Sequence, residues 1–453
     1  MSTGPLFALT LDRRAPPGAQ IERQLRARLG SDALSVGSAL PSTRALAADL
    51  GVSRGVVVRA YAQLAAEGYI ELRRSAAPLV VAQPRSSEAT PAGHDVPIAD
   101  VRFNLRPDLP DLALFPRAQW LAASRASLHR AANTDLAYGE PFGSAVLRHQ
   151  LAPFLARTRG VVATPGRTAV FAGSTQGLFV LASVLRAGGI ERIGVEDPGH
   201  RWRTRALAAA GLDVVPVPVD GDGLRVDRLG KVGAVVLSPD HHFPLGGALS
   251  AQRRRALIEW AAAGERLVVE HDYDGHFRYD RPPAGTLQAL APEHVAYVGS
   301  ASALLVPTVR LGWAVVPDRF VVPVANQMFA SNIATSRLAQ FTLAELIARG
   351  YLDRHLRRAR AAYRRRREVA CAALARHRPD WVVGGVPAGL FLSVTLPPGA
   401  HEAHVLVAAR RRGIAVDGVN EHALRPQAPG LAVGFAAAPE PTLRRALQAL
   451  ARV

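Results

Sequence analysis

The apolar residues of this chain recur with helical spacing in its first part and as short strand-like runs further on. Ile21, Leu25 and Leu29 are four residues apart, which places them on one face of a helix. From about Val101, short runs rich in Val, Ala and Leu alternate with helical segments. The runs lie at Ala169–Phe171, Gly194–Glu196, Val214–Val217, Ala234–Leu237, Leu267–Glu270 and Val295–Val298. Strands that alternate with helices predict an α/β fold with a mainly parallel sheet.

A helix, a glycine turn and a second helix are predicted between Ser42 and Glu67. Ser42 can accept a hydrogen bond from a free backbone amide at the start of a helix, and Gly51 permits the tight turn that ends it. Ser53 is expected to cap the next helix, which runs to Glu67. Two strand-like runs follow before residue 82. This order is a helix-turn-helix followed by a wing.

The same segment resembles the winged helix of GntR-type regulators. The matching residues are Leu40-Pro41-Ser42-x-Arg44-x-Leu46-Ala47, Leu50-Gly51-Val52-Ser53-Arg54, Ala60-Tyr61-x-x-Leu64 and Glu67-Gly68-Tyr69. The resemblance implies DNA contacts by Arg44, Ser53 and Arg54, and a helix N-terminus with Ser and Arg suits phosphate contact. In the alternative interpretation, Ser53 is only a cap and Arg54 a solvated charge. Two positions depart from the family pattern. This chain has Val56 where the family has Thr, and Ser75-Ala76-Ala77-Pro78 where the family has a glycine-rich wing.

The chain is predicted to divide into four parts. These are a winged helix-turn-helix domain at residues 1–82, a linker rich in Pro and Ser at 83–100, a large α/β domain at 101–340, and a long helix with a smaller α+β domain at 341–453. The helical stretch follows Phe341, ends near His377 and carries a dense run of arginines. Leu352 and Leu356 fit an amphipathic helix with a solvated arginine face, and a nucleic-acid patch is the alternative.

A second resemblance begins directly after the last strand-like run. Gly299-Ser300-Ala301-Ser302-Ala303-Leu304-Leu305-Val306-Pro307-Thr308-Val309-Arg310-Leu311-Gly312 is similar to G-T-F-S-K-x-L-x-P-x-L-R-L-G of MocR-type regulators, which share it with fold-type I aminotransferases. In that family the Lys forms a Schiff base with pyridoxal phosphate. The matching residue here is Ala303, whose methyl group cannot attack an aldehyde carbon.

The resemblance to MocR-type regulators covers essentially the whole chain and implies a fold-type I aminotransferase-like domain. The family's E-D-D-Y-D-S-E-F-R-Y is Glu270-His271-Asp272-Tyr273-Asp274-Gly275-His276-Phe277-Arg278-Tyr279. The carboxylate that pairs with the cofactor's ring nitrogen therefore falls on His271. What remains is a cup for an anionic effector, made by Ser174, Thr175, Tyr273, Ser302 and Arg310. Alternatively, Ser302 and Arg310 only satisfy backbone groups of the scaffold.

Composition limits the class of protein. The net charge of +18 fits an anionic partner, and 54 of the 55 basic residues are Arg because Lys231 is the only lysine. The single Cys371 permits no intrachain disulfide and fits a reducing cytoplasm. We expect no signal peptide and no membrane span. Near the pocket motifs lie His200, His241, His242, His271 and His276, with Asp240 and Asp272, but their spacing fits no metal-site pattern.

The sequence therefore predicts a cytoplasmic transcriptional regulator that binds a double-stranded DNA operator as a homodimer. Its aminotransferase-like domain is expected to be a pseudoenzyme with no catalytic residue, no metal and no covalently bound pyridoxal phosphate, and to sense a small anionic effector. Two alternatives stay open. One is a pyridoxal-phosphate-dependent aminotransferase-like enzyme or sensor, and the other is a purely structural dimerisation module.

Overall fold

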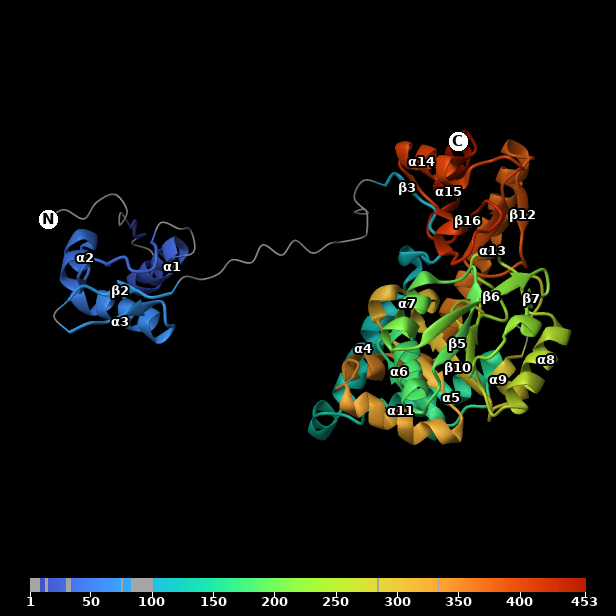
Figure 1. Cartoon of the computed structure of the whole chain (residues 1–453), viewed down its shortest axis with the longest axis horizontal. Coiled ribbons are helices and arrows are strands. Elements are labelled where there is room, and N and C mark those ends of the chain that lie inside the picture. Colours follow the sequence, from blue (N-terminus) through green and yellow to red (C-terminus); the bar gives the residue numbers. More distant parts are fainter. Residues whose placement is uncertain are drawn as a thin grey trace. The chain divides into compact units, whose positions relative to one another are not determined.

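The computed structural model describes residues 9–12, 15–29, 34–74, 76–82, 101–282, 285–332 and 334–453. They belong to two compact units, Met1–Val96 and Pro97–Val453, each described here by itself (Figure 1). The linker predicted at residues 83–100 lies outside the described residues, as does Ser75 of the predicted wing. None of the described helices is long and apolar enough to cross a membrane.

The first unit consists of three helices and a two-stranded wing. The helices are α1 (Pro17–Leu29), α2 (Thr43–Leu50) and α3 (Arg54–Ala66), and the strands β1 (Ile70–Glu71) and β2 (Leu79–Val80) pair antiparallel. The helical face from Ile21 to Leu29 is buried in the core of this unit. Ser42 Oγ accepts a hydrogen bond from the Ala45 amide at 3.1 Å, and Gly51 ends α2 with a φ of 64°. The predicted helix-turn-helix and wing are confirmed.

Eight strands form the large sheet of the second unit, in the order β4-β11-β10-β9-β8-β5-β6-β7. They are β4 (Thr168–Phe171), β5 (Arg192–Asp197), β6 (Asp213–Asp220), β7 (Gly223–Leu224), β8 (Ala234–Leu237), β9 (Leu267–Asp272), β10 (Val295–Ser300) and β11 (Gly312–Val315). Strand β11 runs antiparallel to β4 and β10, and β7 runs antiparallel to β6; the other neighbours are parallel. The predicted mainly parallel sheet is confirmed.

Helices cover both faces of this sheet, as Figure 1 shows. Alternate strand residues such as Val236 and Val269 pack with α6 (Ser174–Ala187), α7 (Arg201–Ala209) and α11 (Asp318–Ala330). Their neighbours Val235 and Val268 pack with α8 (Ala251–Ala262) and α9 (Leu287–Leu290). The largest core includes residues of α4 (Arg117–Arg130), α5 (Ala145–Arg159), α10 (Ala301–Leu304), α12 (Arg337–Ala348) and α13 (Tyr351–His377). The alternation of strand side chains between two cores accounts for the continuous apolar runs in the sequence.

A smaller layer follows α13. Its antiparallel sheet has the order β12 (Val382–Gly384), β13 (Phe391–Thr395), β16 (Gly430–Gly434) and β15 (Asp417–Gly418), accompanied by α14 (Glu402–Arg411) and α15 (Glu440–Leu450). β3 (Phe103–Asn104) pairs in parallel with β14 (Ile414–Ala415). Short 3-10 helices lie at Leu112–Leu114, Asn133–Leu136, Pro165–Arg167, Val226–Arg228, Pro307–Val309 and Asn420–His422. The segment just after residue 100 is therefore part of the C-terminal layer.

The long helical stretch predicted from Phe341 to near His377 consists of two helices in the structure. α12 ends at Ala348, and Gly350, with a φ of 63°, precedes α13 at Tyr351. This left-handed backbone conformation favours glycine and interrupts the helix. The predicted domain boundary between residues 340 and 341 falls inside α12.

Candidate functional site

The residues implied in DNA contact lie together on the surface of the first unit. Arg44 in α2, and Ser53 and Arg54 at the start of α3, are exposed. Arg54 Nε donates to Thr43 Oγ1 at 3.4 Å, which connects the beginnings of the two helices. Ser53 stands at the N-cap position of α3, but its side chain makes no capping hydrogen bond. The predicted side-chain cap is therefore wrong, and this hydroxyl and the first amides of α3 are open to an anion.

Two contacts hold α3 in place. Tyr61 in the middle of α3 donates its hydroxyl to the Pro41 carbonyl at 2.9 Å, and Arg26 of α1 pairs with Glu67 at 2.7 Å. Val56, where the family has Thr, is half-buried against the core of this unit. Its side chain therefore contributes packing rather than a hydroxyl.

In the second unit, the pocket motifs follow the carboxyl ends of strands in the large sheet. Ser174 follows β4, His200 follows β5, His241 follows β8, Tyr273 follows β9 and Ser302 follows β10. These five strands point the same way, because β11 is antiparallel to both β4 and β10 and the others are parallel neighbours. The carboxyl edge of such a sheet is where α/β folds bind ligands.

Arg310 lies beside the N-terminus of α6. Gly312 in β11 is the partner of Phe171 in β4 and of Ser300 in β10, so the ends of those two strands are one strand apart. A Cβ placed on Gly312 would lie 2.8 Å from the Ser174 amide nitrogen, and one placed on Gly173 would lie 3.8 Å from Arg310 Nη1. A guanidinium close to the free amides of a helix start is an arrangement that attracts anions.

The five predicted cup residues are only partly brought together. Thr175 and Arg310 are exposed, and Ser174 is half-buried. Ser302 is held by its neighbour, since its Oγ accepts a hydrogen bond from Ser300 Oγ at 3.0 Å. The Tyr273 hydroxyl donates to the His241 carbonyl at 2.8 Å and is thereby directed to the loop after β8.

The two positions where the family motif is broken are both buried. Ala303 lies in α10, directly after β10, and belongs to the largest core. His271 in β9 is 1% exposed, and neither of its ring nitrogens has a hydrogen-bond partner. Burial, with the charge of Arg203, lowers the pKa of His271 to about 3. The imidazole is therefore neutral near pH 7.

Rings fill the interior beside His271. The His200 ring is stacked on Phe243 with centroids 4.0 Å apart and stands at 87° to the Tyr273 ring, 5.0 Å away. The His271 ring lies 5.4 Å from Trp202. Burial lowers the pKa of His200, which keeps this imidazole uncharged as well. In the part of the chain that the structure describes, no three His, Cys, Asp or Glu residues are placed to hold a metal ion.

An ion-pair network on the other side of β9 was not anticipated from the sequence. Arg159 at the end of α5 pairs with Asp240 and, at 2.6 Å, with Asp272, and the Tyr297 hydroxyl donates to Asp272 at 2.7 Å. Burial alone would raise the pKa of Asp272, but the Arg159 charge outweighs it and the pKa is lowered to about 2. Glu270, two residues earlier in β9, differs: burial, with the charge of Asp240, raises the pKa of Glu270 to about 8.

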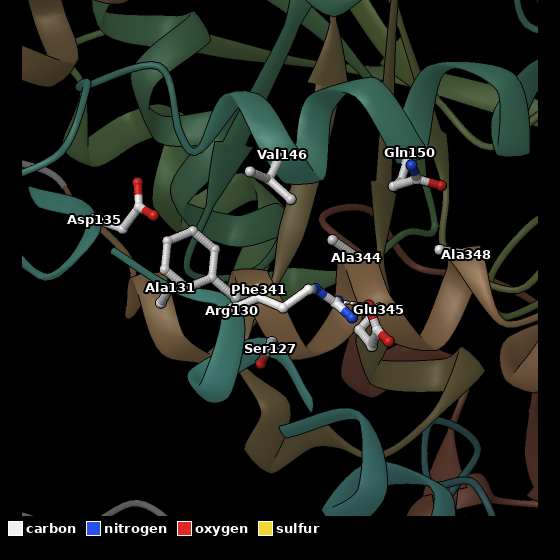
Figure 2. Close-up of a pocket in the computed structure, with 10 residues that line it drawn as sticks. All are labelled: Ser127, Arg130, Ala131, Asp135, Val146, Gln150, Phe341, Ala344, Glu345 and Ala348. Carbon is white, nitrogen blue, oxygen red and sulfur yellow. Dashed lines mark hydrogen bonds and ion pairs between the residues drawn. The ribbon is translucent and has the colours of Figure 1, made fainter. Parts of the chain in front are cut away.

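A separate cavity of about 240 Å³ lies between α4, α5 and α12. Figure 2 shows Val146 and Gln150 of α5 across from Phe341 of α12, with Arg130 of α4 extending toward Glu345, its ion-pair partner. Exposed apolar side chains lie on the elements around it, namely Leu121, Leu128, Leu136, Tyr138, Val146 and Leu338. Exposed apolar side chains around one cavity make this surface a candidate interaction face.

Both units match known protein families. Residues 17–80 match the family described as "Bacterial regulatory proteins, gntR family", and residues 109–450 match "Aminotransferase class I and II". An archaeal alanine:glyoxylate aminotransferase has a similar fold, with a TM-score of 0.72 and 25% identity over 77% of this chain and 90% of that chain. The predicted winged helix-turn-helix domain and fold-type I aminotransferase-like domain are confirmed.

Relatives of similar length carry the same two domains in one chain. The chain is 31% identical over 432 residues to the uncharacterized HTH-type transcriptional regulator YhdI of Bacillus subtilis, covering 92% of this chain and 91% of that protein. It is 33% identical over 356 residues to the HTH-type pyridoxine biosynthesis transcriptional regulator PdxR of Corynebacterium glutamicum, covering 77% of each. The chain belongs to the HTH-type transcriptional regulators that join a gntR-family domain to an aminotransferase class I and II domain.

Proposed function

We propose that this protein regulates transcription by binding operator DNA through its first unit, while its aminotransferase-like domain works without pyridoxal-phosphate Schiff-base chemistry. The observation that carries the second part is Ala303 at the position where the family motif has its lysine. An alanine methyl group provides no amine for an aldehyde. The domain then serves dimerisation and effector sensing rather than transamination.

The residues present at the strand ends do not fit covalently bound pyridoxal phosphate. A neutral His271 has no negative charge with which to hold a pyridinium nitrogen protonated. Lys231, the chain's only lysine, precedes β8 at the end of that strand opposite the pocket motifs. Neither the anchoring amine nor the electronic partner is therefore available at this edge of the sheet.

Incubation of the full chain with pyridoxal phosphate tests this proposal. We expect no aldimine absorbance, no adduct trapped by borohydride within residues 101–453, and no transamination of amino acids. The decisive contrary result is a trapped adduct that mass spectrometry maps to Lys231 in a protein that transaminates. Operator binding is measured separately, by fluorescence anisotropy on the native upstream DNA.

We also propose that Arg310 and the start of α6 form the anion site through which an effector acts. The support is the position of the guanidinium near the Ser174 amide, with Arg310 exposed and Ser174 half-buried. Inorganic phosphate, sulfate and small carboxylates are suitable probes in a thermal-shift measurement. Stabilisation by an anion favours a sensor, and the absence of any stabilisation favours the purely structural dimerisation module.

The domain is proposed to form a homodimer through the face around the cavity between α4, α5 and α12. Aminotransferase-like folds are typically dimeric, and paired half-sites suit a dimeric helix-turn-helix protein. We expect Val146→Asp together with Leu338→Asp to give monomers in analytical ultracentrifugation, because both side chains are exposed on this face. Val382→Asp, which changes an exposed apolar residue of the small sheet, is the matched control and should remain dimeric.

A further inference from the structure

Most of the positive charge of the chain lies outside its DNA-binding unit. Residues 101–453 hold 44 of the 55 Lys and Arg and 28 of the 37 Asp and Glu, a net charge of +16 out of +18. Helix α13 alone carries nine arginines against one Asp and one Glu. This 27-residue helix therefore carries more arginines than any other described element.

The arginines of α13 have two different environments. Arg366 is buried and pairs with Asp111 at 2.7 Å, and Arg360 donates to the His276 carbonyl at 2.7 Å. These two side chains connect α13 to the rest of the second unit. Six others are exposed. Five of them lie within about the first four turns of the helix, and we call them the arginine row: Arg354, Arg357, Arg358, Arg364 and Arg365.

The arginine row lies along one face of the helix. At 3.6 residues per turn its members fall within an arc of about 120° around the helix axis, which keeps them on one side. From Arg354 to Arg365 the helix rises by about 16 Å at 1.5 Å per residue. The opposite face is fixed in the core by Leu352, Leu356 and Tyr363.

Little of this charge is neutralised within the protein. Arg364 lies 3.3 Å from Glu368, and Arg365 lies 3.4 Å from Glu440, and both are surface pairs. Among the residues that the structure describes, no carboxylate lies within ion-pair distance of Arg354, Arg357 or Arg358. Exposed ion pairs are weak, so the row keeps a positive field that concentrates anions.

We propose that the arginine row is a second, sequence-independent contact for the phosphates of duplex DNA. This inference rests on the proposed operator binding by the first unit, which brings flanking DNA to a high local concentration around the chain. A duplex carries one charge per about 1.7 Å of its axis with both strands counted, so a row of about 16 Å runs alongside a stretch of duplex that holds roughly ten phosphates. Arginine suits this partner because its planar guanidinium binds phosphate with two parallel hydrogen bonds.

The geometry favours duplex DNA over single-stranded nucleic acid. Proteins that bind single strands combine basic side chains with exposed aromatic rings on which bases stack. The aromatic residue within the span of the row, Tyr363, is 2% exposed and packs edge-on against Phe277. The row therefore offers phosphate contacts without a stacking platform at its centre.

Salt titrations of the full chain test the proposal. The variant Arg357→Gln with Arg358→Gln removes two charges from the row and keeps good helix formers at both exposed positions. The control, Arg411→Gln with Arg412→Gln, removes two exposed charges at the end of α14. Anisotropy is measured from low to moderate salt on duplexes of about 20 and about 60 base pairs centred on the operator, and unfolding curves establish that both variants are folded.

On the long duplex, the row variant should have a slope of log K against log salt that is shallower by about 1.8, because each phosphate contact contributes about 0.9. On the short duplex, the slope of the row variant should equal that of the unmodified protein. The control variant should have the same slope as the unmodified protein on both duplexes. Equal slopes for the row variant and the unmodified protein on the long duplex overturn the proposal, and so does an equal reduction in the control.

Two further outcomes are distinguishable from these. If the unmodified protein binds neither duplex, operator binding itself is refuted and the inference fails with it. If a single-stranded RNA of the same length binds more tightly than the duplex, and the row variant loses that preference, the surface belongs to RNA and the proposal is overturned.

Discussion

Replacement of His271 by Phe should change how the stability of the second unit depends on pH. His271 is 1% exposed, and its pKa is about 3 in the folded protein against 6.5 in the unfolded chain. Between these values the unfolded chain binds a proton at this position and the folded protein does not. The stability that depends on the neutral ring is therefore present above pH 6.5 and is lost as the pH falls toward 3.

The magnitude follows from these two pKa values. A single group of this kind lowers the free energy of unfolding by about 2 kcal/mol between pH 7 and pH 5, and by about 5 kcal/mol once the pH is below 3. Glu270 acts in the opposite direction, because its pKa of about 8 exceeds its ordinary value of 4.5. Its contribution to stability is lost as the pH rises from 4.5 to 8. The informative quantity is thus the difference between the variant and the unmodified protein, in which Glu270 cancels.

The assay is urea unfolding at pH 5 and pH 7, followed by tryptophan fluorescence. All five tryptophans lie in residues 101–453, so their emission reports on the second unit alone. His271→Phe should gain about 2 kcal/mol relative to the unmodified protein between pH 7 and pH 5. The substitution also removes two buried nitrogens without hydrogen-bond partners, which changes the free energy of unfolding by about 1–3 kcal/mol. This change is equal at both pH values and therefore cancels when the two are compared. His149→Phe, at an exposed position, should follow the unmodified protein.

One result would refute the reasoning: the same difference in unfolding free energy between His271→Phe and the unmodified protein at pH 5 and pH 7. Such a result means that the imidazole binds a proton equally well in both states, and hence that it reaches water or an acceptor in the folded protein. The conclusion that position 271 cannot protonate a cofactor nitrogen would then lose its physical basis.

Three further predictions concern the two binding sites. Arg44→Ala and Arg54→Ala should each weaken operator binding and reduce the salt slope by about 0.9 in gel-shift titrations; unchanged affinity in the double variant removes both from the DNA contact. Ala303→Lys should give weak aldimine absorbance with pyridoxal phosphate at most, and adding His271→Asp should strengthen it; no gain from the second change contradicts the role given to position 271. Arg310→Ala should reduce the heat of inorganic phosphate binding in calorimetry, whereas equal heats place the anion elsewhere.

Six strands of the large sheet could be predicted from the sequence because each of them contains an apolar run. Ala234–Leu237 is β8 residue for residue, whereas the run at Leu267–Glu270 continues as β9 through Asp272. The added residues are polar, and hydropathy does not predict their burial. Asp272 is buried because Arg159, 113 residues away in the sequence, supplies its counter-charge at 2.6 Å. The sequence alone does not predict this ion pair, because the two residues meet only in the folded chain.

The location of the candidate site was predictable, but its contacts were not. Motif positions after β4, β8, β9 and β10 meet at one edge of the sheet, as parallel strands require. The direction of each side chain depends on neighbours distant in sequence: the Tyr273 hydroxyl donates to the carbonyl of His241, and Ser53 makes no capping bond although its position is right for one. The sequence-based prediction does not include the break at Gly350, where a φ of 63° favours glycine and interrupts the helix.

The pairing of β3 with β14 determines where the chain leaves the second unit. The Phe103 amide donates to the Gly413 carbonyl at 2.9 Å, and the Leu105 amide donates to the Ala415 carbonyl at 2.8 Å. The first residues after position 100 are thus hydrogen-bonded to the small C-terminal layer. They are not part of the large sheet, beside which lie Arg310 and the start of α6. Any ligand that shifts the small layer against the large sheet therefore also moves the point at which the DNA-binding unit is tethered.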